Sequence, residues 1–214
     1  MLGQQCAVPA NRPVIAIPPP TIEPAPKVTF ETSSGKIVLE LFPQQAPKSV
    51  ENFLRYVKEG FYNNKIFHSV GSEGIIRGGS YDVHLNPGQQ YEPVVNESNN
   101  GLQNLRGRLG LYPPAGGDSV TCEFYINLAD TPDRDFDLAT GTRRFPVIGK
   151  VAEGMAVVDE IGLLPTTSRT AADGRALSAI PEEPPVILRV FLNEEEILPP
   201  DLPPVDNNRP PIVS

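Results

Sequence analysis

The sequence predicts a mainly β protein, because two of its stretches have the pattern of β-hairpins. Residues 28–32 and 36–42 alternate apolar and polar side chains around a Ser-Ser-Gly turn and are rich in β-branched residues. Residues 66–70 and 75–77 are a second pair of short apolar runs, joined by a Gly/Ser/Glu turn and closed by a glycine pair. Both pairs are typical of antiparallel strands.

Proline is concentrated at the two ends of the chain. Of the 25 prolines, seven lie in the first 26 residues and six in the last 16. Because proline has no N–H to donate to a strand or helix, regular structure is not expected in these ends. The sequence therefore predicts a proline-rich N-terminal extension over 1–26, one domain over 27–193, and a proline-rich acidic C-terminal tail over 194–214.

The charge balance argues against two classes of partner. The 214 residues carry a net charge of −8, and the isoelectric point is about 4.8. Phosphate backbones and anionic membrane surfaces would be repelled, so no nucleic acid partner is expected. The sequence has no run of about 18 apolar residues, so no membrane insertion is expected either.

Cys6 and Cys122 are the only cysteines, which is too few for a disulfide framework and the wrong spacing for a zinc site. One bridge between them is left open by the sequence. The first residues lack the charged and apolar regions of a signal peptide. A proline-rich leader before a compact domain is nevertheless common in exported proteins, which favours a periplasmic or exported location over a cytoplasmic one.

A helix is predicted after the first hairpin. Pro43 and Pro47 end the preceding strand, and Pro47 suits the first turn of a helix. Gly60 suits the far end as a left-handed cap. The apolar positions recur at helical spacing and are Ala46, Val50, Phe53, Leu54 and Val57.

Three motifs resemble the cyclophilin family. Residues 67–79, with Phe-His-x-Val followed by Arg-Gly-Gly, are similar to the family signature, which is usually Phe-His-Arg-Val and then Gln-Gly-Gly. Residues 95–107 resemble the family's Asn-Glu-x-x-x-Gly-Leu-x-Asn-x-Arg-Gly stretch nearly position for position. Residues 119–127 resemble its Ser-x-x-Ser-Gln-Phe-Phe-Ile strand.

The resemblance extends over residues 27–193 in the expected order. Residues 145–151 match a closing strand, 157–161 match a second helix, and 186–192 supply a last strand. The resemblance implies a closed antiparallel eight-stranded cyclophilin-like β-barrel capped by two α-helices, an architecture that leaves no free sheet edge.

The resemblance also implies a peptidyl-prolyl cis-trans isomerase that needs no cofactor and no metal. A prolyl bond isomerises slowly because twisting it removes amide resonance, with a barrier of about 18–20 kcal/mol. A catalyst therefore needs an apolar cup for the ring, an anchor for the flanking backbone, and a hydrogen-bond donor near the nitrogen, preferably a cation. The expected partners are proline-containing peptides or unfolded protein segments, and the protein is expected to be a monomer.

The chain departs from the family pattern at the residues that would perform this chemistry. Ser69 stands where the family has its catalytic arginine, Arg77 where it has a glutamine, and Glu123 where it has a second glutamine. Positions 69 and 77 on neighbouring antiparallel strands are expected to point into one pocket, where Arg77 would pair with Glu123. The predicted catalytic residues are Arg77, Glu123 and Ser69, with weak activity because a hydroxyl does not replace a guanidinium.

The resemblance places seven further side chains around the substrate. They are Phe67, His68, Ile75, Tyr112, Tyr125, Phe136 and Phe145. The competing interpretation of Phe67 is barrel core, and that of His68 is a structural residue.

Two functions of different classes stay open. Arg77 favours an isomerase, whereas Ser69 favours a non-catalytic module that binds proline-containing segments. The run Asp133-x-Asp135-x-Asp137 resembles the start of a calcium loop, but it lacks the following glycine and the distal glutamate. A solvated acidic loop and no metal site are therefore expected there.

Overall fold

The computed structural model describes residues 25–114, 117–142 and 144–193. Eight strands close into a barrel in the order β1-β12-β3-β4-β8-β6-β9-β2, with every pair antiparallel. The barrel strands are β1 Lys27–Thr32, β2 Gly35–Leu41, β3 Lys65–Val70, β4 Ile75–Asp82, β6 Arg108–Leu111, β8 Phe124–Asn127, β9 Val147–Glu153 and β12 Val186–Asn193. The two small sheets are β5 Val94–Val95 with β7 Ser119–Val120, and β10 Thr166–Thr170 with β11 Ala176–Pro181. The predicted closed eight-stranded barrel is confirmed.

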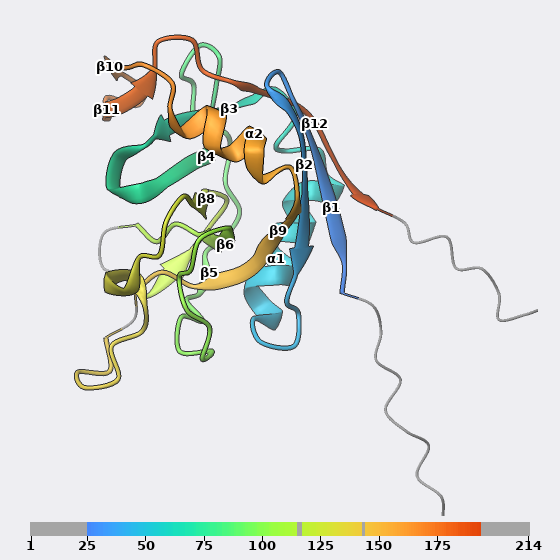
Figure 1. Ribbon diagram of the computed structural model, residues 1–214, viewed down its shortest axis with the longest axis vertical. Helices are drawn as coiled ribbons and strands as arrows, with labels where there is room; N and C mark the ends of the chain where they lie inside the picture. Colours follow the sequence, from blue (N-terminus) through green and yellow to red (C-terminus); the bar gives the residue numbers. More distant parts are fainter. Residues whose placement is uncertain (1–24, 115–116, 143, 194–214) are drawn as a thin grey trace, which may run out of the picture.

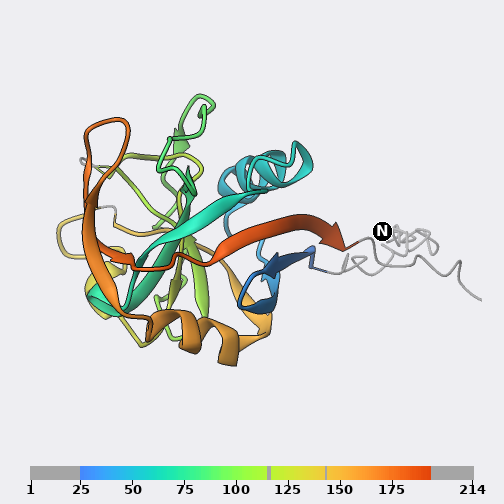
Figure 2. The same ribbon diagram turned by 90° about the horizontal axis from the view of Figure 1, so that it is seen from above.

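The two helices lie on opposite sides of the barrel (Figure 1 and Figure 2). Helix α1 (Pro47–Lys58) packs against β12 and β5, and α2 (Met155–Gly162) packs against β2 and β4. Pro47 occupies the first turn of α1, as predicted, and Gly60 follows its end with φ +68°. The carboxylate of Glu97 accepts a hydrogen bond of 2.8 Å from the N–H of Ser49, which stabilises the start of this helix.

The main core fills the barrel and continues under the inner faces of both helices. Phe124 lies at its centre and makes edge-to-face contacts with Phe30 and with Phe67, at ring-centroid distances of 5.4 and 5.8 Å. Phe53 of α1 and Tyr62 join this aromatic cluster. Phe67 is fully buried in the core, so its predicted place around the substrate is wrong and the core interpretation holds.

The β10–β11 hairpin, which the sequence did not predict, packs against β3 (Figure 1). Its first strand reads Thr-Thr-Ser-Arg-Thr, a polar run with no apolar alternation to predict it. The hairpin encloses a second, smaller core of Ile66, Tyr81, Leu85, Ala171, Leu177 and Ile180. The hydroxyl of Tyr81 also donates a hydrogen bond of 3.2 Å to Asp173 at the hairpin tip.

The predicted strand over 119–127 is interrupted at residues 121–123. The carbonyl of Thr121 accepts a hydrogen bond of 2.8 Å from the side-chain amide of Asn52, and the carbonyl of Cys122 accepts one of 2.8 Å from the hydroxyl of Tyr62. Side-chain donors thus take the place of ladder partners along this segment. The pairing of β8 with its neighbours begins only at Phe124.

The glycine pair was predicted to close the second hairpin, but β4 continues through it to Asp82. Gly79 has φ +95°, a conformation that residues with a Cβ rarely adopt. A Cβ at this position would also lie 2.9 Å from the ring of Tyr62. The pair therefore allows an irregularity inside the strand instead of ending it.

The predicted extension over 1–26 lies outside the described residues except for 25 and 26, and the predicted tail over 194–214 lies wholly outside them. Cys6 is among the residues that are not described, so the bridge that the sequence leaves open between Cys6 and Cys122 also lies outside the described residues. Cys122 is buried, and burial raises the pKa of its thiol to about 11. None of the helices in the described part of the chain has the length and hydrophobicity that a membrane-spanning helix needs.

Candidate active site

An open pocket with a volume of about 1000 Å³ lies beside the β10–β11 hairpin. It is lined from β3, β4 and β11, from the segment before β8, and from the segments that follow β6 and precede β9. Five predicted site residues line it: His68, Arg77, Tyr112, Glu123 and Phe145.

Glu123 is the anion of this pocket. Its carboxylate accepts a hydrogen bond of 3.0 Å from the hydroxyl of Ser80 and contacts Nε2 of His68 at 3.3 Å. Burial alone would raise the pKa of this carboxyl, but the hydrogen bond and charge of His68, the charge of Arg77 and the hydrogen bond of Ser80 outweigh it and hold the pKa below its ordinary value. Glu123 is therefore an ionised, firmly held carboxylate.

His68 reaches Glu123 because the pairing of β3 with β4 is irregular. Phe67 pairs with Gly78 and Ser69 pairs with Arg77, so His68 is one extra residue between two consecutive partners. Such a bulge changes the direction in which a side chain points. The imidazole is 1% exposed, and its ring packs edge-on against Tyr81 at 5.1 Å.

Arg77 lies between Glu123 and the aromatic wall. Its Nε is 3.0 Å from Oε1 of Glu123, an ion-pair distance, although the N–H does not point at the oxygen. The guanidinium carbon lies 4.2 Å from the ring centroid of Tyr112, which adds a cation–π contact. The expected pairing of Arg77 with Glu123 is present.

The aromatic wall is formed by Tyr112 and Phe145, whose rings meet edge to face at 5.1 Å. The ring of Tyr125 packs edge to face against Phe145, with a centroid distance of 5.7 Å. Tyr125 is fully buried and does not line the pocket. Its hydroxyl donates a hydrogen bond of 2.6 Å to Asn104, and burial raises its pKa. Gly110 leaves room for this side chain, since a Cβ there would collide with the ring.

The structure does not bring the other predicted residues to the pocket. Ser69 pairs with Arg77 in the sheet but does not line the pocket. The residues of β3 and β4 that line it are His68, Arg77 and Tyr81. Ile75 is buried where β4 meets β8. Phe136 lies in a separate hollow of about 480 Å³.

Arg134 is the residue of this loop that contacts Phe145. Its guanidinium lies 5.0 Å from the ring centroid of Phe145 and forms an ion pair of 2.7 Å with Glu73, and its side chain is only 10% exposed. Asp135 explains the position of Phe136, because its carboxylate accepts hydrogen bonds of 2.6 and 3.0 Å from the backbone and side chain of Asn104. This anchor turns the next residue, Phe136, away from the pocket.

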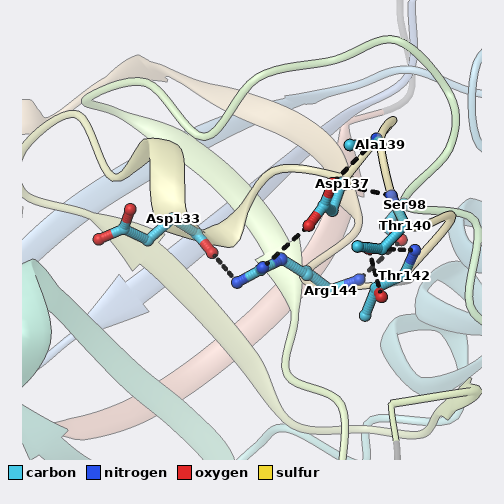
Figure 3. Close-up of polar contacts among 7 residues, drawn as sticks. All are labelled: Ser98, Asp133, Asp137, Ala139, Thr140, Thr142 and Arg144. Atoms are coloured by element: carbon cyan, nitrogen blue, oxygen red, sulfur yellow. Dashed lines mark hydrogen bonds and ion pairs between the residues drawn. The ribbon is translucent and has the colours of Figure 1, made fainter.

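Arg144 and Arg175 also line the pocket, although no sequence motif predicted them there. Arg144 precedes the aromatic wall and is the hub of the polar contacts in Figure 3, and Arg175 belongs to the hairpin that was not predicted. Asn104, by contrast, carried a signal, since it belongs to the Asn-Glu…Asn-x-Arg-Gly motif.

Comparison with known proteins identifies the family. Residues 27–189 match the family described as "Cyclophilin type peptidyl-prolyl cis-trans isomerase/CLD". The chain belongs to this family. Peptidyl-prolyl cis-trans isomerase B of Escherichia coli is 38% identical over 173 residues, which cover 78% of this chain and 99% of that protein. A peptidyl-prolyl cis-trans isomerase of Acinetobacter baylyi is 40% identical over 142 residues, or 66% of this chain and 74% of that protein.

Solved cyclophilins have the same fold. A cyclophilin type peptidyl-prolyl cis-trans isomerase of Cryptosporidium parvum superposes with a TM-score of 0.61 at 21% sequence identity, covering 80% of this chain and 99% of that one. A second structure of that protein was determined in the presence of the dipeptide Ala-Pro, with a TM-score of 0.61 at 22% identity over 79% of this chain and 99% of that one. The predicted fold, family and isomerase class are confirmed.

The pocket of this cyclophilin supplies a cation, a fixed carboxylate and an aromatic wall. Within the described residues no group of three or more His, Cys, Asp or Glu side chains gathers as metal ligands would. The acidic run of 133–137 has other contacts: Asp135 holds Asn104, and Asp137 accepts hydrogen bonds from the backbone N–H groups of Ala139 and Thr140. The arrangement suits binding and electrostatic stabilisation of a twisted amide.

Proposed function

We propose that this cyclophilin isomerises Xaa-Pro bonds of peptides and unfolded protein segments in the pocket, with Arg77 as the cationic donor. The observation that carries the proposal is the ion pair of 3.0 Å between Arg77 and Glu123, a carboxylate that His68 and Ser80 hold in turn. The charge of Glu123 attracts the guanidinium to this side of the pocket, and the planar group has N–H donors for a substrate.

The chemistry needs no proton transfer. When the prolyl bond twists, the nitrogen loses amide resonance and gains a lone pair that accepts a hydrogen bond. A guanidinium N–H of Arg77 directed at this nitrogen stabilises the twisted state more than the planar one, which is what lowers the barrier. Tyr112 and Phe145 offer an apolar surface for the proline ring.

Activity is proposed to be weak. Arg77 is 24% exposed, so water screens part of its charge, and its Nε–H does not point at the carboxylate that would orient it. Ser69, at the position of the usual family arginine, supplies no second cation. The same observations favour the alternative proposal, a module that binds proline-containing segments without isomerising them.

Replacement of Arg77 tests the proposal. In Arg77→Ala we expect kcat/KM for a short Xaa-Pro peptide to fall about 10- to 100-fold, because the donor to the twisted nitrogen is lost. NMR exchange spectroscopy measures the cis-trans rate directly, and Arg77→Lys is the matched control that keeps the charge without the planar fork. A rate within about twofold of the wild type in Arg77→Ala would exclude Arg77 as the donor. Binding of the peptide without any acceleration in the wild type would establish the binding module instead.

We also propose that the protein is a monomer, that it is periplasmic or exported, and that it has no nucleic acid or membrane partner. The net charge of −8 supports the last point, and the proline-rich first residues support the location. Sedimentation velocity tests the monomer, cell fractionation tests the location, and a band-shift assay with vesicle flotation tests the excluded partners.

A further inference from the structure

The pocket carries more accessible positive than negative charge, in a chain whose net charge is −8. Three arginines line it, namely Arg77, Arg144 and Arg175, with side chains 24%, 41% and 65% exposed. Glu123 is the one carboxylate among its described lining residues. It is 14% exposed, and its oxygens already contact His68, Ser80 and Arg77.

Arg175 forms the wall on the side of the β10–β11 hairpin. Its one ion-pair partner within the described residues is Asp173, at 3.7 Å from Nε. Asp173 also accepts hydrogen bonds from the hydroxyl of Tyr81 and from the backbone N–H of Arg175. Arg175 lines the pocket, whereas Asp173 does not. Within the described residues Asp173 is contacted by Nε and the backbone N–H of Arg175, which leaves the two terminal nitrogens of the guanidinium available to a ligand.

Arg144 forms the wall on the side of the aromatic residues, where its surroundings hold it in place (Figure 3). Its backbone N–H donates to the hydroxyl of Ser98 at 3.1 Å, and Nη1 donates to the carbonyl of Asp133 at 2.8 Å. Its contact with Asp137 is long, at 3.4 Å, and the same carboxylate accepts two backbone N–H groups. Asp137 therefore neutralises Arg144 only in part, and it too does not line the pocket.

We infer that the pocket selects proline-containing segments that carry an acidic side chain, Asp or Glu, close to the proline, and that Arg175 is the main specificity residue with Arg144 as a second one. The inference rests on the proposed function and names the substrate class of the same site. A guanidinium binds a carboxylate through two parallel N–H donors, which a neutral amide of the same size does not reproduce. A pocket of about 1000 Å³ has room for the proline and the residues beside it.

The test is a peptide scan in which each charged peptide has a neutral reference of the same size. One neutral Xaa-Pro peptide is compared with two series in which Glu or Gln occupies, in turn, the two positions before and the two positions after the proline. For the wild type we expect the Glu peptide to exceed the Gln peptide in kcat/KM about three- to fivefold at one or more of these positions, the size that a partly exposed ion pair gives. In Arg175→Gln the ratio should fall toward one, and in Arg175→Glu it should fall below one.

Arg189→Gln is the control, because Arg189 lies on β12 against Phe191 and is exposed outside the pocket. It should leave the ratio of Glu to Gln unchanged. A wild-type ratio of one at all four positions, with the neutral peptide still isomerised, would overturn the inference and leave the proposed function standing. A ratio that persists in Arg175→Gln and in Arg144→Gln would overturn the assignment of these arginines. If no peptide is isomerised, the proposed function fails, and affinities from chemical-shift titration of the same peptides still decide the charge preference.

Discussion

The β1–β2 and β3–β4 hairpins are built from similar apolar runs, but one builds the core and the other builds the pocket. β1 and β2 pair in an unbroken register of six residue pairs. β3 and β4 pair with a register shift on each side of Phe67. An unbroken register keeps alternate side chains on one face, whereas each shift re-aims a residue. The pocket therefore depends on the places where the barrel departs from regular pairing.

The two hairpins also differ in where their side chains lie. In the regular hairpin, Val28, Phe30, Ile37 and Leu39 are fully buried in one core. In the irregular hairpin, neighbouring residues serve three different surroundings: Ile66 joins the second core, Phe67 the main core, and His68 the pocket. Stability should therefore be most sensitive to the first hairpin and activity to the second.

The largest expected effect is on stability in the regular hairpin. Phe30 is fully buried and contacts the rings of Phe53, Tyr62 and Phe124. We expect Phe30→Ala to lower the free energy of unfolding by about 3–5 kcal/mol, because it removes a large apolar group and leaves a cavity. Urea denaturation measures this loss.

The neighbouring strand offers the control for Phe30→Ala. Leu188 on β12 is 54% exposed, so Leu188→Ala should change the free energy of unfolding by no more than about 0.5 kcal/mol. The rate per folded molecule should be unchanged in both variants, since neither residue lines the pocket. A loss below about 1 kcal/mol in Phe30→Ala would contradict the assignment of this hairpin to the core.

A smaller effect is expected on the stability at acid pH. The irregular hairpin contributes to it because His68, Arg77 and Ser80 contact the carboxylate of Glu123. The pKa of this carboxyl is lower in the folded protein than its ordinary value of 4.5, so the unfolded chain takes up the proton first as the pH falls. The stabilisation is complete above about pH 4.5 and is lost as the pH falls through the lower pKa of the folded state.

Glu123→Gln should therefore show a shallower decrease of unfolding free energy with pH than the wild type below pH 4.5. Chemical denaturation at several pH values between about 6 and 3 measures the two slopes. Glu183→Gln, at an exposed position, controls for the loss of one negative charge. Equal slopes in Glu123→Gln and the wild type would show that the contacts of His68, Ser80 and Arg77 do not lower this pKa.

The same contrast explains what the sequence predicts well. The regular hairpin, helix α1 and the barrel follow from alternation, helical spacing and ordered motif matches, because period and register translate directly into structure. The pairing of Arg77 with Glu123 was also predicted, since it depends on two neighbouring strands whose family motifs are clear.

Other parts of the site depend on local geometry that no periodicity encodes. The bulge at His68 and the anchor of Asp135 on Asn104 decide which side chains face the pocket, and they displaced Ser69 and Phe136 from their predicted places. The β10–β11 hairpin has a polar first strand, so Arg175 was not expected at the pocket at all. Register shifts and side-chain anchors of this kind are consequences of the folded context.

The smallest expected effect is the sharpest test of this comparison, because it concerns Ser69, the position of the usual family arginine. Ser69 is only partly buried, pairs with Arg77 in the sheet and does not line the pocket. We expect Ser69→Ala to leave kcat/KM within about twofold of the wild type and the free energy of unfolding within about 0.5 kcal/mol. Arg77→Ala, at the partner position across the two strands, should lose activity in the same NMR exchange assay. A loss in Ser69→Ala as large as that in Arg77→Ala would mean that both positions reach the substrate and that the register shift beside His68 does not separate them.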